Sequence, residues 1–214
     1  MQNTFEKMDK MYRGQRYIYD ATRKFYLLGR DDLLDLIDPS PEERVLEIGC
    51  GTARNLIALA RSHPDAKFFG LDASSAMIDT ASAKVAAAGV TNIELKTALA
   101  DDITYAGTFL QPSPFDKAFF SYSISMIPTW KAAIENALEN IRAGGTLFIV
   151  DFYDQAQLPG TFRALLKWWL SKFHVEYWED LIPFLRSLED SKRCKVSIIP
   201  VFRRYAFIAV IEKL

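Results

Sequence analysis

One stretch, RVLEIGCGTARNLIALA at residues 44–60, constrains the fold of this chain more than any other. An apolar strand pattern leads into a turn that contains Gly49 and Gly51, and a helical pattern begins directly after the turn. A strand, a glycine turn and a helix in this order are typical of the first unit of a nucleotide-binding α/β sheet. The Gly-x-Gly-x-x-Gly pattern of dinucleotide sites is incomplete, however, because Arg54 stands where the third glycine belongs.

The rest of the chain continues this alternation of strands and helices. Further strand-like runs lie at residues 67–72, 92–98, 115–123 and 143–152. Helical patterns separate them, near residues 53–61, 74–88 and 129–141. Ser74 or Ser75 suits the N-cap of the second of these helices. Strands that alternate with helices predict a parallel, doubly wound sheet with right-handed crossovers.

The last two strand-like runs break the alternation. Residues 195–202 and 205–213 are joined only by Arg203 and Arg204, a link too short for a crossover helix but suitable for an antiparallel hairpin. We therefore predict an α/β, Rossmann-like fold with a mostly parallel sheet, a C-terminal antiparallel hairpin and helices on both faces. The 214 residues are enough for one domain with a full core. Within it we expect residues 1–38 to form a helical lid and residues 155–193 a helical insert that caps the substrate site.

Composition and charge exclude several classes of protein. The net charge is −1, which argues against a nucleic-acid-binding protein, although residues 1–30 carry seven basic against three acidic side chains. The sequence predicts neither a signal peptide nor a membrane span. The two cysteines, Cys50 and Cys194, have no metal-binding spacing, so we expect no metal site and a reducing, cytoplasmic location.

A carboxylate beside the glycine turn decides which ligand the turn suits. Glu47 lies at the end of the first strand, where an anionic pyrophosphate would gain nothing from it. A ligand with an ammonium and a sulfonium group would gain, and S-adenosylmethionine is such a ligand. The stretch resembles motif I of class I methyltransferases, E-x-G-x-G-T, through Glu47, Gly49, Gly51 and Thr52. A nicotinamide oxidoreductase and a cofactor-binding regulator without turnover are correspondingly disfavoured.

This resemblance implies roles for residues in the next strand and its turn. Asp72 ends the second strand about 20 residues on, where an acid accepts hydrogen bonds from ribose hydroxyls. LDASSAM, at residues 71–77, resembles the second motif of the family and implies that Met77 packs near the adenine. Each residue also has a structural reading, because turn glycines often serve backbone geometry alone and acids at strand ends often cap helices.

The full set of expected cofactor contacts extends from the N-terminal segment to the fourth strand. It comprises Tyr19, Tyr26, Arg30, Glu47, Gly49, Cys50, Gly51, Thr52, Asn55, Asp72, Ala73, Met77, Ala100, Asp101 and Ser121. The adenine contact stays open. Related methyltransferases place an acid before an alanine after the third strand, but here Leu99 precedes Ala100. Asp101 or Asp102 supplies the hydrogen bond instead, or both are solvated loop residues.

Three other stretches narrow the resemblance. YDATRKFYLLGRD (19–31), SYSISMIPTW (121–130) and FHVEYWEDLIPFL (173–185) resemble the bacterial N-methyltransferases that make betaine lipids from diacylglyceryl-homoserine. The first stretch also resembles, more distantly, the quinone C-methyltransferases. The resemblance implies an enzyme that methylates a lipid amine headgroup, with a quinone or another small molecule as the alternative substrate. It further implies that Tyr19 and Tyr26 close the pocket over the methionine end of the cofactor, with Arg30 near its carboxylate.

Methyl transfer is an in-line displacement, so such an enzyme mainly aligns the reactants and excludes water. Aromatic faces suit the quaternary ammonium that the last transfer produces. Candidate rings are Tyr19, Phe25, Tyr26, Tyr122, Trp168, Trp169, Tyr177 and Trp178, unless they pack helices onto the sheet. The expected catalytic side chains are Tyr19, Tyr122 and His174. His174 accepts a proton from the amine or orients the headgroup, or it is structural.

A lipid substrate raises the question of how the enzyme reaches a bilayer. TFRALLKWWLSKF, at residues 161–173, mixes large apolar with basic side chains, as do helices that lie in the interface of an anionic membrane. The alternative is an ordinary lid helix whose apolar face packs on the core. With the basic segment 1–30, this stretch predicts reversible contact with an anionic membrane at its inner face.

Overall fold

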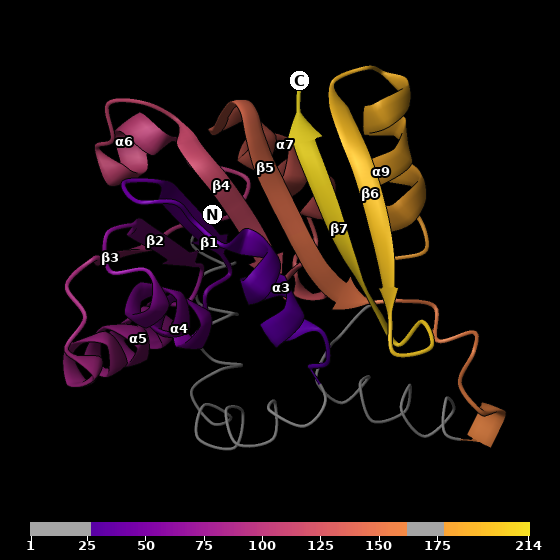
Figure 1. The fold of residues 1–214 in the computed structure, drawn as a ribbon, viewed down its shortest axis with the longest axis horizontal. Helices are drawn as coiled ribbons and strands as arrows, with labels where there is room; N and C mark the ends of the chain where they lie inside the picture. The colour runs from indigo at the N-terminus through magenta and orange to yellow at the C-terminus, as the bar shows by residue number, and fades with distance from the viewer. Residues whose placement is uncertain (1–26, 162–177) are drawn as a thin grey trace.

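The structure is a computed structural model of the chain and describes residues 27–161 and 178–214. A seven-stranded sheet in the order β3-β2-β1-β4-β5-β7-β6 forms its centre (Figure 1). The strands are β1 (Arg44–Ile48), β2 (Lys67–Asp72), β3 (Ile93–Thr97), β4 (Phe115–Ser121), β5 (Ile141–Phe152), β6 (Cys194–Val201) and β7 (Ala206–Lys213). The first five pair in parallel, whereas β7 runs antiparallel to both β5 and β6. The predicted fold class, including the C-terminal hairpin, is confirmed.

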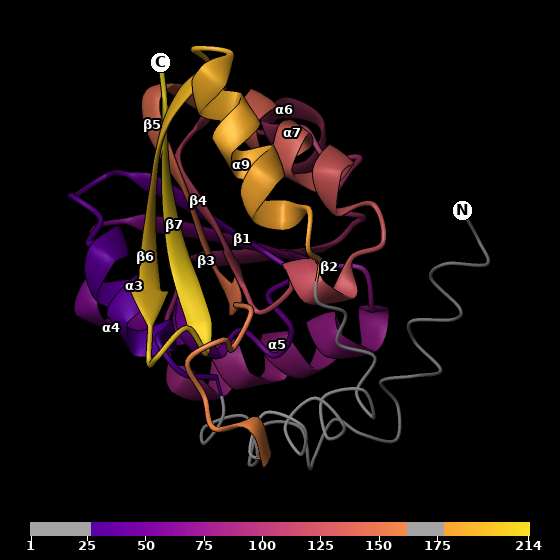
Figure 2. The same cartoon turned by 90° about the vertical axis from the view of Figure 1, so that its right-hand side faces the viewer.

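Helices cover both faces of this sheet (Figure 2). The described helices are α3 (Arg30–Ile37), α4 (Arg54–Ser62), α5 (Ser75–Ala88), α6 (Tyr105–Phe109), the 3₁₀ turn η1 (Ile124–Met126), α7 (Trp130–Glu139) and α9 (Leu181–Asp190). The apolar side chains of α3, α4 and α5 pack on one face, and those of α6, α7 and α9 pack on the other. Side chains alternate along β1 accordingly: Leu46 and Ile48 enter the core under α7 and α9, and Val45 enters the opposite core.

Local sequence chemistry explains where α5 begins and ends. The Ser74 hydroxyl accepts a hydrogen bond from the Met77 amide, so Ser74 is the N-cap of this helix. Gly89 ends the helix with a φ of 68°, a left-handed conformation that favours glycine. The sequence patterns did not predict α6 and η1, because helices of five and three residues are too short to show a helical period.

The order of the strands creates the edge where a ligand can bind. From β1 the chain builds outward through β2 and β3 on one side, and then returns to place β4 and β5 on the other. Parallel sheets bind ligands outside the carboxyl ends of their strands, at the point where the strand order reverses. Here that point lies between β1 and β4. Because β7 is antiparallel to both its neighbours, β6 also ends at this edge, with the start of β7 between it and the end of β5 (Figure 1).

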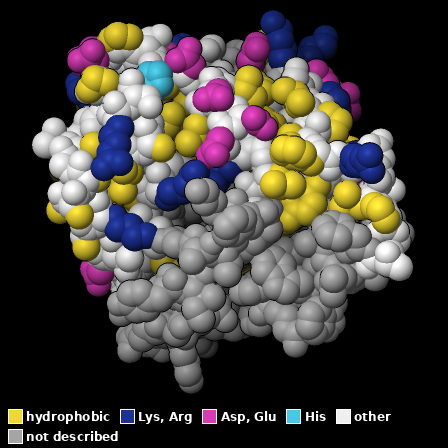
Figure 3. Space-filling view, turned by 60° about the horizontal axis from the view of Figure 1, so that its bottom comes forward, with side chains coloured by type: hydrophobic (Ala, Val, Ile, Leu, Met, Phe, Trp, Pro, Cys, Tyr) yellow, Lys and Arg dark blue, Asp and Glu magenta, His cyan; other side chains and the backbone are white. Residues whose placement is uncertain are grey.

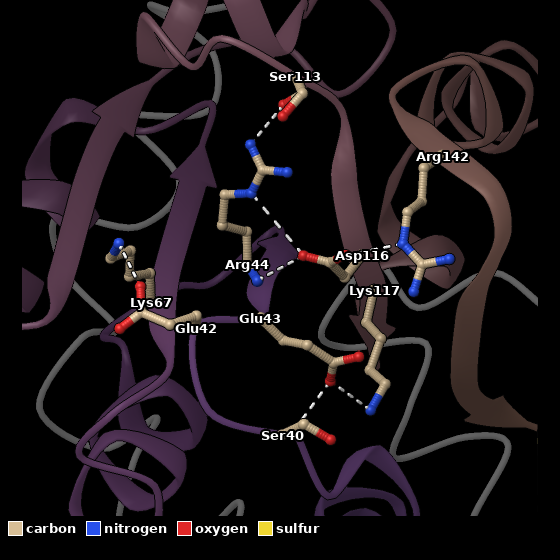
Figure 4. Close-up of polar contacts among 9 residues, drawn as sticks. All are labelled: Ser40, Glu42, Glu43, Arg44, Lys67, Ser113, Asp116, Lys117 and Arg142. Atoms are coloured by element: carbon tan, nitrogen blue, oxygen red, sulfur yellow. Dashed lines mark hydrogen bonds and ion pairs between the residues drawn. The ribbon is translucent and has the colours of Figure 1, made fainter.

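The opposite edge of the sheet is held by a polar network (Figure 4). Asp116 accepts hydrogen bonds from the Arg44 amide at 2.8 Å and from Arg142 Nε at 2.7 Å, and so joins the amino ends of β1, β4 and β5. Burial alone would raise the pKa of Asp116, but the bonds and charges of the two arginines bring its pKa below the ordinary value. Lys117 pairs with Glu43 at 2.8 Å beside it. This edge is therefore a structural clamp, away from the reversal point.

Candidate functional site

The turn after β1 has the backbone that its two glycines allow. Gly49 and Gly51 have φ values of 76° and 53°. A Cβ at Gly49 would lie 2.6 Å from the Ser123 Cβ, so a larger residue is excluded there by space as well as by conformation. At Gly51 a Cβ would meet no atom of the described residues within 4 Å. The turn is therefore packed on its inner side at Gly49 and open at Gly51, where a ligand can approach the backbone.

Bonds to the end of β2 hold this turn in place. The amides of Gly49 and Cys50 both donate to the Leu71 carbonyl at 2.9 Å, and the Gly51 amide donates to Asp72 Oδ2 at 2.9 Å. The other Asp72 oxygen accepts from the Ser74 amide at 2.9 Å. These two bonds fix the orientation of the Asp72 carboxylate beside the turn.

Glu47 is the most unusual ionisable group at this edge. Its side chain is 1% exposed, and Oε1 accepts a hydrogen bond from Asn55 Nδ2 at 2.7 Å. Oε2 has no hydrogen-bond partner among the described residues. Burial raises the pKa of Glu47 to about 8, against the opposing effects of the Asn55 bond and of the Arg30 and Arg54 charges. A buried carboxylate oxygen without a partner is costly, and a ligand ammonium would satisfy it. The site thus fits the cationic amino acid end of S-adenosylmethionine.

The end of β4 contributes three successive residues to the same edge. Ser121 is buried, and its hydroxyl has no partner among residues 27–161 and 178–214. Ser123 donates to the Ile48 carbonyl at 2.8 Å and so ties this loop to β1. Tyr122, with a φ of 54°, is buried and donates its hydroxyl to the Leu28 carbonyl. Burial raises the pKa of Tyr122 well above its ordinary value, so the hydroxyl keeps its proton.

The structure brings most of the expected cofactor residues to one edge. Those at the ends of β1, β2 and β4, in the turns that follow and in the first turns of α4 and α5 are Glu47, Gly49, Cys50, Gly51, Thr52, Asn55, Asp72, Ala73, Met77 and Ser121. Arg30, at the start of α3, is close enough to act on the Glu47 charge. Ala100 and Asp101 are half-buried in the turn after β3, and Asp102 is exposed. Tyr19, Tyr26 and His174 lie outside the described residues.

One polar residue at this edge, Asp151, was missed by the sequence reasoning. Asp151 lies near the end of β5 and is 2% exposed, and its Oδ2 accepts from the Ser125 amide at 3.0 Å. The sequence does contain a signal for Asp151, because an acid that follows an apolar run is the same pattern that singled out Asp72. Figure 3 views the molecule from this side and shows hydrophobic side chains gathered next to acidic ones.

The Tyr122 hydroxyl donates a hydrogen bond to the Leu28 carbonyl, in the segment before α3. The catalytic role predicted for Tyr122 stays a prediction. The buried Cys50 thiol, whose pKa burial raises, lies beside Gly70 in the core. No helix within residues 27–161 and 178–214 combines the length and the apolar character needed to cross a bilayer.

Comparisons with known proteins agree with this geometry. A family model described as a methyltransferase domain matches residues 39–188. An uncharacterized protein of Rickettsia prowazekii is 36% identical over 90 residues, which are 42% of this chain and 16% of that protein. The demethylmenaquinone methyltransferase of Bacillus mycoides is 24% identical over 150 residues, which are 70% of this chain and 60% of that protein. The matched regions thus span less than two thirds of either relative.

Among solved structures, a SAM-dependent methyltransferase from Aquifex aeolicus superposes with a TM-score of 0.61 at 18% identity, over 99% of this chain and 98% of that one. This likeness concerns the fold, and it includes the mostly parallel sheet with its terminal hairpin. The family model covers well over half of the chain. The chain therefore belongs to the methyltransferase domain family and has the fold of a SAM-dependent methyltransferase.

Proposed function

We propose that this protein is an S-adenosylmethionine-dependent N-methyltransferase that acts on a lipid amine headgroup, converting diacylglyceryl-homoserine into a betaine lipid. When bound, the cofactor supplies a methyl group, whose bond to sulfur breaks as the amine lone pair forms the new N–C bond. The protein's part is to hold the two reactants in line and to exclude water. Transfer to a tertiary amine releases no proton, whereas transfers to less substituted amines release one.

The cofactor half of the proposal rests on the turn after β1. Among the described residues, Glu47 Oε2 has no partner and Gly51 has no neighbour at its Cβ position, so the first suits the ammonium of the methionine part and the second lets that part approach the backbone. Asp72, bonded to the Gly51 amide, stands where it can accept from the ribose. Arg30, at the start of α3, supplies a positive charge for the methionine carboxylate.

One observation supports a lipid amine as the methyl acceptor. Residues 121–130 and 173–185 both resemble the betaine lipid enzymes, and their described parts contact each other although about 50 residues separate them. Trp178 Nε1 donates to the Ile124 carbonyl at 3.1 Å. The Trp130 ring lies 6.1 Å from the Trp178 ring and 5.3 Å from the Phe184 ring. These aromatic side chains gather next to the end of β4, where faces that suit an alkylated ammonium are needed.

Transfer of radiolabelled methyl groups tests this proposal directly. The purified protein is incubated with labelled S-adenosylmethionine and vesicles that contain diacylglyceryl-homoserine, phosphatidylethanolamine or a demethylated quinone. We expect label in diacylglyceryl-homoserine, in products with one, two and three methyl groups. Label in the quinone alone would overturn the lipid amine in favour of the alternative that the matched Bacillus enzyme suggests by its name.

A lipid substrate also requires peripheral membrane contact. The stretch expected to provide it, with Trp168 and Trp169, lies outside the described residues. Sedimentation should show binding to vesicles that contain anionic lipid, weaker binding at high salt, and weaker binding again when both tryptophans are changed to alanine. Equal sedimentation with neutral and anionic vesicles would rule out the electrostatic part of this contact.

A further inference from the structure

The turn that joins β6 to β7 projects from the carboxyl edge of the sheet. Ala206 of β7 pairs with Phe152, the last residue of β5, and with Val201, the last residue of β6. The turn after Val201 therefore stands beyond the ends of both strands (Figure 1). We call residues 202–205 the hairpin tip. It lies at the same edge as the glycine turn and the expected cofactor contacts.

The hairpin tip has a backbone conformation that its residues disfavour. The Tyr205 amide donates to the Phe202 carbonyl at 3.1 Å, so Arg203 and Arg204 are the two central residues of the turn. Their φ values are 55° and 61°, and that of Phe202 is 45°. A hairpin turn with positive φ at both central positions favours Asn and Gly, because a larger side chain is strained there. The stability of the turn alone therefore does not explain this sequence.

Bonds to the segment after β5 hold the tip in this conformation. The Arg204 carbonyl accepts from the Gln155 amide at 2.9 Å, and the Tyr205 carbonyl accepts from the Tyr153 amide at 2.9 Å. The Arg204 guanidinium forms a two-pronged ion pair with Asp154 and lies 4.4 Å from the centre of the Tyr153 ring. One of the two central arginines thus fastens the tip to the body of the protein.

The other side chains of the tip are apolar or positively charged, and they are exposed. Phe202 is 57% exposed and Ile199, near the end of β6, is 43% exposed, and Pro200 between them is exposed as well. Arg203 is exposed and makes no ion pair with the described part of the chain. Apolar side chains next to an unmatched cation suit the interface of an anionic membrane, where rings enter between headgroups and cations meet phosphates.

We infer that the hairpin tip docks this protein on an anionic lipid bilayer, with the Phe202 ring between the headgroups and the Arg203 guanidinium at their phosphates. The inference rests on the proposed function, because a lipid acceptor has to be reached at the surface of a bilayer. Docking through the tip turns the carboxyl edge of the sheet, and with it the glycine turn, toward that surface. The strained turn keeps both docking side chains exposed while Arg204 stays paired with Asp154.

Vesicle sedimentation without any methyl acceptor tests the inference. The vesicles contain phosphatidylcholine alone, or phosphatidylcholine with an equal amount of phosphatidylglycerol. Phe202→Asn should weaken binding to the anionic vesicles about tenfold, because the apolar ring is lost. Arg203→Asn should weaken it about fivefold at low salt and less at high salt. Asn tolerates positive φ, so both variants should melt at or above the wild-type temperature, which separates lost docking from unfolding.

Two exposed residues at the opposite edge of the sheet provide matched controls. Leu110, which is 81% exposed with a φ of 53°, lies between α6 and the start of β4. Lys192, which is exposed with a φ of 56°, lies between α9 and the start of β6. Leu110→Asn and Lys192→Asn remove the same kinds of side chain and should leave vesicle binding unchanged. Wild-type binding in both tip variants, or equal weakening by the controls, would overturn the inference.

A dye at the tip reports insertion directly. The cysteines of the protein, Cys50 and Cys194, are buried, so a cysteine-reactive, polarity-sensitive dye would label Phe202→Cys at the tip. Its emission should shift to the blue when anionic vesicles are added, whereas the same dye on Leu110→Cys should not respond. Unchanged emission at the tip on bound protein would contradict insertion.

Methyl transfer separates failure of the docking from failure of the proposed function. If diacylglyceryl-homoserine is methylated while the tip variants bind vesicles as the wild type does, the proposed function stands and the docking is wrong. If vesicle binding depends on Phe202 but only a quinone is methylated, the docking stands and the proposed substrate is wrong, since a quinone is also reached at a bilayer. Phe202→Asn should methylate a dissolved short-chain acceptor at the wild-type rate, because the change lies outside the reaction site.

Discussion

Replacing Glu47 by glutamine should stabilise the protein without ligand while weakening its cofactor site. The carboxyl has a pKa of about 8 in the folded protein against 4.5 as the reference value, because burial disfavours the charge. The folded state thus binds the proton more tightly than the unfolded state. The fold therefore loses stability from this group as the pH rises from 4.5, and the loss is complete only above 8.

The size of the effect follows from this difference. At pH 7, keeping the folded carboxyl protonated costs about 1.4 kcal/mol for each pH unit above 4.5, or about 3 kcal/mol in total. Glutamine has nearly the same shape, carries no charge and keeps an oxygen that can accept from Asn55. We expect Glu47→Gln to raise the free energy of unfolding by about 3 kcal/mol at pH 7 and by almost nothing at pH 4.5.

Urea unfolding of the two proteins at pH 4.5, 7 and 8 measures this difference, and other titrating groups cancel between them. A difference that does not grow with pH would refute the reasoning.

The same variant should bind S-adenosylmethionine more weakly, because the ammonium loses its counter-charge. In the wild-type protein, binding at pH 7 should also release a proton, since the ammonium favours the charged carboxylate. Calorimetry in buffers of different ionisation enthalpy detects that proton, which should be absent in Glu47→Gln.

Three further changes probe the edge and the clamp. Asp72→Ala should weaken S-adenosylmethionine binding by about 1.5–3 kcal/mol, measured by calorimetry, and unchanged affinity would remove Asp72 from the site. Asp116→Asn should destabilise the protein at neutral pH. The difference in unfolding free energy should shrink as the pH falls through the lowered pKa of Asp116, since that carboxylate stabilises the fold only while charged. Urea unfolding of both proteins at pH 7 and pH 3 measures this difference. Tyr122→Phe removes the donor to the Leu28 carbonyl and should cost about 1–3 kcal/mol of unfolding free energy. A loss of kcat in Tyr122→Phe while cofactor affinity and thermal stability stay unchanged would instead support a catalytic role for its hydroxyl.

Much of the fold could be read from the sequence, because its signals are local. Apolar runs of strand length, helical spacing and glycines at fixed offsets predicted β1 to β7 and the longer helices α4, α5 and α7 between them. The two-residue link at Arg203 and Arg204 predicted the hairpin, since no crossover fits so short a connection. The glycine turn with Glu47 and Asp72 predicted the cofactor edge for the same reason, as strand, turn and acid follow one another closely in the chain.

Only the tertiary structure decided which distant residues meet. Asp151 was passed over in the sequence because its meaning depends on Ser125 and Trp178, which reach it through the order of β4 and β5 and the position of α9. The raised pKa of Glu47 likewise depends on a burial that no sequence pattern reports. Periodicity reports which side of an element is apolar, but burial and hydrogen-bond partners are set by the neighbours that the sheet order brings together.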